Sequence, residues 1–127
     1  MGRAAAPGDR RGWGNTAEDS AVRFLEARGW RVRARNWTCR YGELDVVAER
    51  DEFVCFVEVR MRSSTVCGEP VDTVSFAKQR RVVKAAMHYL FQYDVRERMV
   101  RFDVISVVGR GAHATVEHIP GAFDAGM

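Results

Sequence analysis

Two carboxylate residues, Asp45 and Glu58, stand inside stretches that are otherwise largely apolar and are typical of β-strands. Asp45 lies in GELDVVA, residues 42–48, and Glu58 lies between two valines in FVCFVEVRMR, residues 53–62. Burying an unpaired carboxylate costs free energy, so acids in buried strands are normally paired or bound to a metal. These two acids are therefore the first candidates for chemistry in this chain.

A two-residue turn at positions 51–52 would join the two strands into a hairpin in which residue 50 pairs with residue 53. In that register Asp45 lies directly opposite Glu58, and Glu43 lies opposite Arg60. Opposed residues have Cβ atoms about 5 Å apart, and like charges there destabilise the pair. A divalent cation held by oxygen ligands would remove that penalty. The alternative is a wetter face of the sheet, with Glu43 and Arg60 as an ordinary cross-strand ion pair.

The composition is that of a globular protein, with 46% apolar and 29% charged residues in a chain of 127. The formal net charge is +3, and the basic residues gather in two groups, at 28–40 and 78–84. Clustered arginines are an electrostatic footprint for phosphate backbones. The alternative is a solvated surface in which arginine replaces lysine, as in genomes of high GC content.

The chain has no sequence feature of a membrane or secreted protein. No apolar run approaches the ~20 residues that a membrane-spanning helix needs, and the N-terminus lacks the apolar region of a signal peptide. Cys39, Cys55 and Cys67 are widely spaced, which argues against a zinc site or a disulfide framework. We expect a cytoplasmic protein without membrane contact, in which residues 13–124 form one domain between a flexible tail at 1–12 and a short tail at 125–127.

The hydrophobic pattern predicts an alternation of helices and strands. An amphipathic helix is expected over 15–28, with Asn15 or Thr16 as its N-cap. A strand over 30–37 would have one apolar face and one arginine face. The strands at 42–49 and 53–60 follow, then a loop at 61–72, a long helix at about 73–93, and strands at 100–108 and 114–119. This order predicts an α/β fold with a mixed central sheet flanked by helices.

Five segments together carry a family resemblance. GELDVVA, FVEVR and FAKQRRVVKAAMHYL, with RFDVISV and VEHIPGAF near the C-terminus, resemble the YraN family of uncharacterised bacterial proteins over about residues 13–124. That family is similar to the PD-(D/E)xK nuclease superfamily, and within it to the archaeal Holliday junction resolvases. The resemblance implies a restriction-endonuclease-like αβββαβ core, which is the order predicted above.

The resemblance also implies a metal-dependent catalytic site. By position, Asp45 and Glu58 would be the two acids of the superfamily motif, and Glu18 would be the additional acid of many resolvase-like members. These three would hold Mg²⁺ or Mn²⁺, with the Val59 carbonyl as a further ligand. Arg60 stands where the superfamily usually has its lysine. Arginine stays protonated near pH 7 and is a poor general base, although it can stabilise charge on a phosphate.

The implied partner is nucleic acid, with structured, branched DNA favoured. Arg33, Arg35, Lys78 and Arg81 would contact its backbone. Resolvases act as dimers because a four-way junction presents two equivalent strands, so a homodimer is one expectation. Gly42 stands near a position where many superfamily members carry proline.

Structural alternatives stay open for several of these residues. Glu18 would also fit as the capping-box acid of the first helix, and Lys78 and Arg81 as the solvated face of the second. Asp103 could be a further acid near the end of the sheet, although a lone aspartate in a strand is usually a surface residue or a hydrogen-bond anchor. The three tryptophans suit a core, although they could stack on bases, and the three histidines show no metal-ligand spacing.

Three functions are compatible with the sequence. The first is a metal-dependent endonuclease that acts on structured DNA. The second is a nucleic-acid-binding protein that does not cut, because arginine has replaced the motif lysine. The third is a scaffold that uses the nuclease fold for protein interactions.

Overall fold

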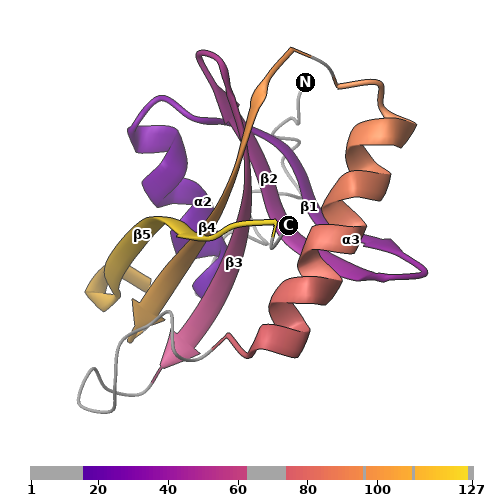
Figure 1. Cartoon of the computed structure of the whole chain (residues 1–127). Helices are drawn as coiled ribbons and strands as arrows, with labels where there is room; N and C mark the ends of the chain where they lie inside the picture. The colour runs from indigo at the N-terminus through magenta and orange to yellow at the C-terminus, as the bar shows by residue number, and fades with distance from the viewer. Residues whose placement is uncertain (1–15, 63–73, 96, 110, 126–127) are drawn as a thin grey trace.

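A five-stranded mixed sheet lies between two helices in the computed structural model, which describes residues 16–62, 74–95, 97–109 and 111–125 (Figure 1). In chain order, the elements are α2 (Ala17–Ala27), β1 (Arg31–Cys39), β2 (Gly42–Arg50), β3 (Phe53–Arg62), α3 (Phe76–Gln92), β4 (Met99–Val108), the short 3₁₀ helix η2 (Gly111–His113) and β5 (Thr115–Phe123). The predicted α/β class is confirmed, and the order is consistent with a restriction-endonuclease-like core.

The strands follow one another across the sheet in the order β1-β2-β3-β4-β5. β1, β2 and β3 form an antiparallel meander, and β3 pairs with β4 in parallel. Parallel neighbours need a crossover connection, and α3 lies within it. β5 then pairs antiparallel with β4. The mixed central sheet is as predicted.

The two helices cover opposite faces of the sheet, so the protein has two apolar layers. On one face, Val22 and Leu25 of α2 pack against Val46, Val57 and other residues of the sheet. The α3 side packs a second cluster of buried residues, which includes Val47, Phe56, Val82 and Tyr89. Each strand therefore serves two cores, which explains why the central strands are apolar at successive positions rather than alternating.

The first helix begins one residue later than a cap at Asn15 would place it. The Thr16 hydroxyl accepts a hydrogen bond from the Asp19 N–H at 3.0 Å, and the Asp19 carboxylate accepts from the Thr16 N–H at 3.3 Å. This reciprocal pair is a capping box. The interpretation of Glu18 as the capping-box acid was wrong, because a helix capped by Thr16 has Asp19 at its third position.

The arginines of β1 do not share one face of the sheet, so that prediction was also wrong. The register between β1 and β2 shifts between Val32 and Ala34, which leaves one extra residue, Arg33, in β1. Val32 packs on the α2 side and Ala34 on the α3 side. An extra residue reverses which face each later side chain takes. Arg33 consequently meets α3, whereas Arg35 meets α2.

Several predicted boundaries shift by a few residues. α3 begins at Phe76 with Ser75 as its N-cap, and Thr73 lies outside the described residues. β3 continues to Arg62 and β5 to Phe123, both farther than predicted. The expected tail at 1–12 and most of the expected loop at 61–72 also lie outside the described residues. Neither helix of the described part is long and apolar enough to cross a membrane.

Candidate functional site

The predicted hairpin brings the two strand acids to neighbouring positions. Arg50 pairs with Phe53 as expected, and the same register continues along the strands to Val46 and Val57. The next position along this register is Asp45 beside Glu58. Oδ2 of Asp45 accepts a hydrogen bond from the Val59 N–H at 2.9 Å. This bond anchors the Asp45 carboxylate at the point where the regular backbone pairing of β2 with β3 ends.

Glu58 is buried, with only 1% of its surface exposed. Burial, and then the neighbouring charge of Asp45, raise the pKa of Glu58 to about 7, against opposing effects of Lys78 and Arg60. Its Oε1 is buried and has no hydrogen-bond partner among the described residues. The alternative that Glu58 lies on a wet face of the sheet was wrong. A buried, incompletely satisfied carboxylate is unusual enough in a folded protein to suggest a functional role.

Two basic side chains adjoin this acid pair. Lys78 lies in the first turn of α3, and its Nζ is 3.4 Å from Oε1 of Glu58. That distance makes an ion pair, but its geometry is not that of a hydrogen bond, so the Glu58 oxygen stays short of a donor. Arg60 is half-buried and follows Glu58 by two positions in β3, where alternation puts both side chains on one face. Glu43 and Arg60, both described, form no ion pair, so that alternative was wrong.

The backbone at Gly42 explains one departure from the superfamily pattern. Gly42 opens β2 with a φ of +150°. Proline is restricted to φ near −65° and could not take this conformation, whereas glycine adopts it freely. A Cβ atom at Gly42 would lie 3.8 Å from Cβ of Arg81, so this end of β2 lies against α3. Arg81 itself is exposed.

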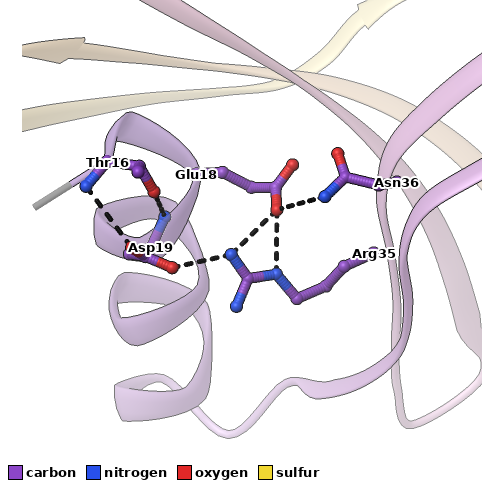
Figure 2. Close-up of polar contacts among 5 residues, drawn as sticks. All are labelled: Thr16, Glu18, Asp19, Arg35 and Asn36. Atoms are coloured by element: carbon purple, nitrogen blue, oxygen red, sulfur yellow. Dashed lines mark hydrogen bonds and ion pairs between the residues drawn. The ribbon is translucent and has the colours of Figure 1, made fainter. Parts of the chain in front are cut away.

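Glu18 does not join the acid pair. Figure 2 shows its carboxylate at the start of α2, where Oε1 accepts from Nε of Arg35 at 2.9 Å and from Nδ2 of Asn36 at 3.0 Å. Arg35 also donates to the buried Asp19 at 2.7 Å. Burial acts to raise the pKa of Asp19, but hydrogen bonds from Arg35 and Thr16 outweigh it and hold that pKa below its ordinary value.

The contacts in Figure 2 attach α2 to β1, on the face of the sheet opposite α3. Arg35 therefore serves a contact inside the protein. Within the described ranges, no group of three or more His, Cys, Asp or Glu side chains is arranged to hold a metal ion.

Arg33 is likewise held by internal contacts. Its guanidinium donates to the Tyr89 hydroxyl at 2.9 Å and to Glu49 at 3.1 Å. Glu49 is buried and also pairs with Arg31 and Arg98. Sequence reasoning missed Glu49, because an acid near a strand end next to a turn usually faces solvent. The alternation of β2, which places residues 45, 47 and 49 on one face, was the signal that could have found it.

Asp103 is the other buried acid that the sequence left open, and it is a hydrogen-bond anchor. It accepts from Arg101 through both oxygens, from the Gly121 N–H, and contacts His118 Nε2 at 2.6 Å. Burial acts to raise the pKa of Asp103, but these contacts outweigh it and hold that pKa well below its ordinary range. Burial also raises the pKa of the Cys55 thiol far above its ordinary value. This cluster is satisfied internally and ties β4 to β5.

The donor set at the acid pair suits Mg²⁺ or Mn²⁺. Such ions take oxygen ligands, and Mg²⁺ is commonly bound by one or two carboxylates with water and substrate phosphates in the other positions. Asp45, Glu58 and the Val59 carbonyl supply ligands of this kind. The unsatisfied Oε1 of Glu58 is the observation that favours a cation here, because a cation would satisfy it and offset the repulsion from Asp45.

The layered sheet, its two covering helices and the acid pair on β2 and β3 define an α/β protein with a restriction-endonuclease-like core. The chain matches the model of "Uncharacterised protein family UPF0102" over residues 17–107. It belongs to this family, which is the YraN family that the sequence resembles.

Curated relatives match along nearly their whole length. A "UPF0102 protein" of Myxococcus xanthus (strain DK1622) is 74% identical over 125 residues, which cover 98% of this chain and 99% of the relative. A "UPF0102 protein" of Syntrophotalea carbinolica is 42% identical, over 87% of this chain and 90% of the relative. One of Persephonella marina is 39% identical, over 87% and 92%.

Proposed function

We propose that this protein is a Mg²⁺- or Mn²⁺-dependent endonuclease that hydrolyses phosphodiester bonds in structured, branched DNA. The observation that carries the proposal is the pair of acids, Asp45 and Glu58, on adjacent strands. Glu58 is buried, and its Oε1 has no hydrogen-bond donor within the described part of the chain. A buried carboxylate beside a second acid is costly to a fold. A bound cation would offset this cost, and a metal site would explain why the two acids occur together.

Asp45, Glu58 and the Val59 carbonyl would hold the metal ion. When bound, the ion lowers the pKa of its water and neutralises charge on the phosphate. The hydrogen bond from the Val59 N–H fixes one oxygen of Asp45, which leaves its other oxygen for the ion. The proposed metal site does not include Glu18, because Arg35 and Asn36 hold its carboxylate at the start of α2.

Arg60 and Lys78 would contact the substrate rather than remove a proton from water. Arg60 remains charged and presents several donors to phosphate oxygens. Arg81, exposed on α3 beside the start of β2, would contact the backbone of the same strand. The choice of branched DNA, and of a homodimer that acts on it, rests on the resemblance to resolvases.

A protein that binds nucleic acid without cutting it is the second candidate. Arg60 at the position of the motif lysine favours it, since arginine cannot act as a general base near pH 7. In that case the acid pair would bind a metal ion that positions a phosphate, and hydrolysis would not follow.

The decisive experiment is a cleavage and binding assay with labelled four-way junction, flap, single-stranded and duplex DNA in Mg²⁺, Mn²⁺ or EDTA. We expect cutting that needs metal and is lost in Asp45→Ala and Glu58→Ala. The matched control is Asp51→Ala, which removes an exposed acid from the hairpin turn and should cut normally. Binding without cutting would support the second candidate and make Arg60→Lys the next variant. If the protein neither binds nor cuts any of these DNAs, a nucleic-acid function is refuted.

A further inference from the structure

Glu58 already has a counter-ion at the position where the proposed metal would bind. Nζ of Lys78 lies 3.4 Å from its Oε1, and the Glu58 side chain is almost fully buried. Lys78 reaches it from a different element, the first turn of α3, where Ser75 caps the helix by accepting from the Lys78 N–H at 3.1 Å. The helix cap therefore fixes the point from which the lysine extends to the acid.

Among the described residues, Lys78 is the only cation within ion-pair distance of Glu58. Arg60 affects the Glu58 pKa through its charge but makes no ion pair with it. The ion pair with Lys78 is also incomplete, because Oε1 accepts no hydrogen bond from any residue that the structure describes. A loosely held ammonium group on a buried carboxylate is a contact that a doubly charged ion could replace.

The lysine has both the length and the exposure to move away. Its side chain is 35% exposed, and a lysine carries its compact charge on a flexible four-carbon stem. Once the ammonium group leaves Glu58, this flexible stem would let it reach a DNA phosphate bound beside the acid pair.

We infer that Lys78 is an exchangeable counter-ion, which neutralises Glu58 in the metal-free protein and is displaced when a divalent cation binds, so that it becomes free to contact a DNA phosphate. This inference rests on the proposed function. It also predicts that metal binding and DNA binding strengthen each other through Lys78, which a site made of the two acids alone would not predict.

The test is the affinity for Mn²⁺ in the absence of DNA, measured by isothermal titration calorimetry at about pH 8.5, where protons compete little for the carboxylates. Lys78→Met removes the competing charge, and we expect it to bind Mn²⁺ about tenfold more tightly than the unchanged protein. Lys84→Met is the matched control, because it removes the same charge from an exposed position of α3. It should bind as the unchanged protein does.

Lys78→Gln provides a second, more polar variant in case the methionine disturbs folding, which circular dichroism would reveal. Equal or weaker Mn²⁺ binding by a folded Lys78 variant would overturn the inference while leaving the proposed metal site intact. If neither the unchanged protein nor the variants bind Mn²⁺, the proposed function fails as well. Tighter binding by Lys78→Met or Lys78→Gln, but not by Lys84→Met, supports the exchange.

Coupling to DNA provides a second readout. Ca²⁺ can occupy an oxygen site of this kind, and its use tests binding separately from cutting. We expect Ca²⁺ to raise the affinity of the unchanged protein for a four-way junction more than that of Lys78→Met. An equal effect of Ca²⁺ on both proteins would refute the release of Lys78 to phosphate.

Discussion

Replacing Glu58 by glutamine tests the electrostatics of the acid pair directly, because it removes the charge and preserves the shape. In the folded protein the pKa of Glu58 is raised to about 7, compared with its ordinary value of 4.5. The folded state therefore holds the proton more tightly than the unfolded state. The contribution of Glu58 to the free energy of unfolding is therefore fully present below pH 4.5, and it is lost as the pH rises from 4.5 through about 7.

The size of the effect follows from the same two values. A difference of about 2.5 pKa units corresponds to about 3 kcal/mol, since each unit is worth about 1.4 kcal/mol. Glutamine does not ionise and escapes this loss. In the metal-free protein at pH 8 we expect Glu58→Gln to be more stable than the unchanged protein, by up to about 3 kcal/mol. Near pH 4.5 the two should differ little.

Urea denaturation in EDTA at both pH values would measure these free energies of unfolding. Glu43→Gln is the control, because Glu43 is an exposed acid of the same strand, β2, and its replacement should not change the pH dependence. If Glu58→Gln is no more stable than the unchanged protein at pH 8, the ion pair with Lys78 fully offsets the cost of burial. That result would refute the view that the acid pair is a source of instability without a metal.

Three further predictions concern the residues that hold the fold. Asp103→Asn should lower the free energy of unfolding by about 3–5 kcal/mol in urea, since it weakens the charged hydrogen bonds of a fully buried carboxylate. Because the pKa of Asp103 is depressed, its stabilisation is present above the ordinary pKa of 3.8 and is lost as the pH falls further. A loss below about 1 kcal/mol would contradict this prediction. Arg35→Met should cost about 2 kcal/mol in the same assay by leaving the buried Asp19 without its charged partner, and an unchanged midpoint would show that α2 is held by apolar packing alone. An alkylating reagent should modify Cys39 in the native protein but Cys55 only after unfolding, because Cys55 is buried and its pKa is raised. Mass spectrometry of the peptides would measure the modification of each cysteine. Rapid labelling of Cys55 in the native protein would contradict its burial.

Much of the candidate site could be predicted because it depends on local rules. A two-residue turn determines the register of a hairpin, so the proximity of Asp45 and Glu58 follows from counting residues. The strand after the long helix returns beside β3 because that is how a crossover connection packs. The family resemblance added the expected roles of these residues.

The partners of the charged side chains could not be predicted in the same way. Arg33 and Arg35 lie close together in the sequence, yet the extra residue in β1 sends one toward α3 and the other toward α2. A composition-based interpretation assigns both to nucleic acid. The structure instead pairs them with Glu49 and with Glu18 and Asp19.

The class of fold, the order of the elements and the adjacency of the two strand acids follow from the sequence alone, because hydrophobic periodicity and turn length act within a short stretch of chain. Three features became visible only in the folded protein: Lys78 is the cation beside Glu58, Glu18 is engaged by Arg35 and Asn36, and the Asp103 carboxylate has a full set of partners. These outcomes depend on burial and on contacts between elements far apart in the chain. The free energy of a charge depends on its surroundings in three dimensions, and those surroundings form only when helices and sheet pack together.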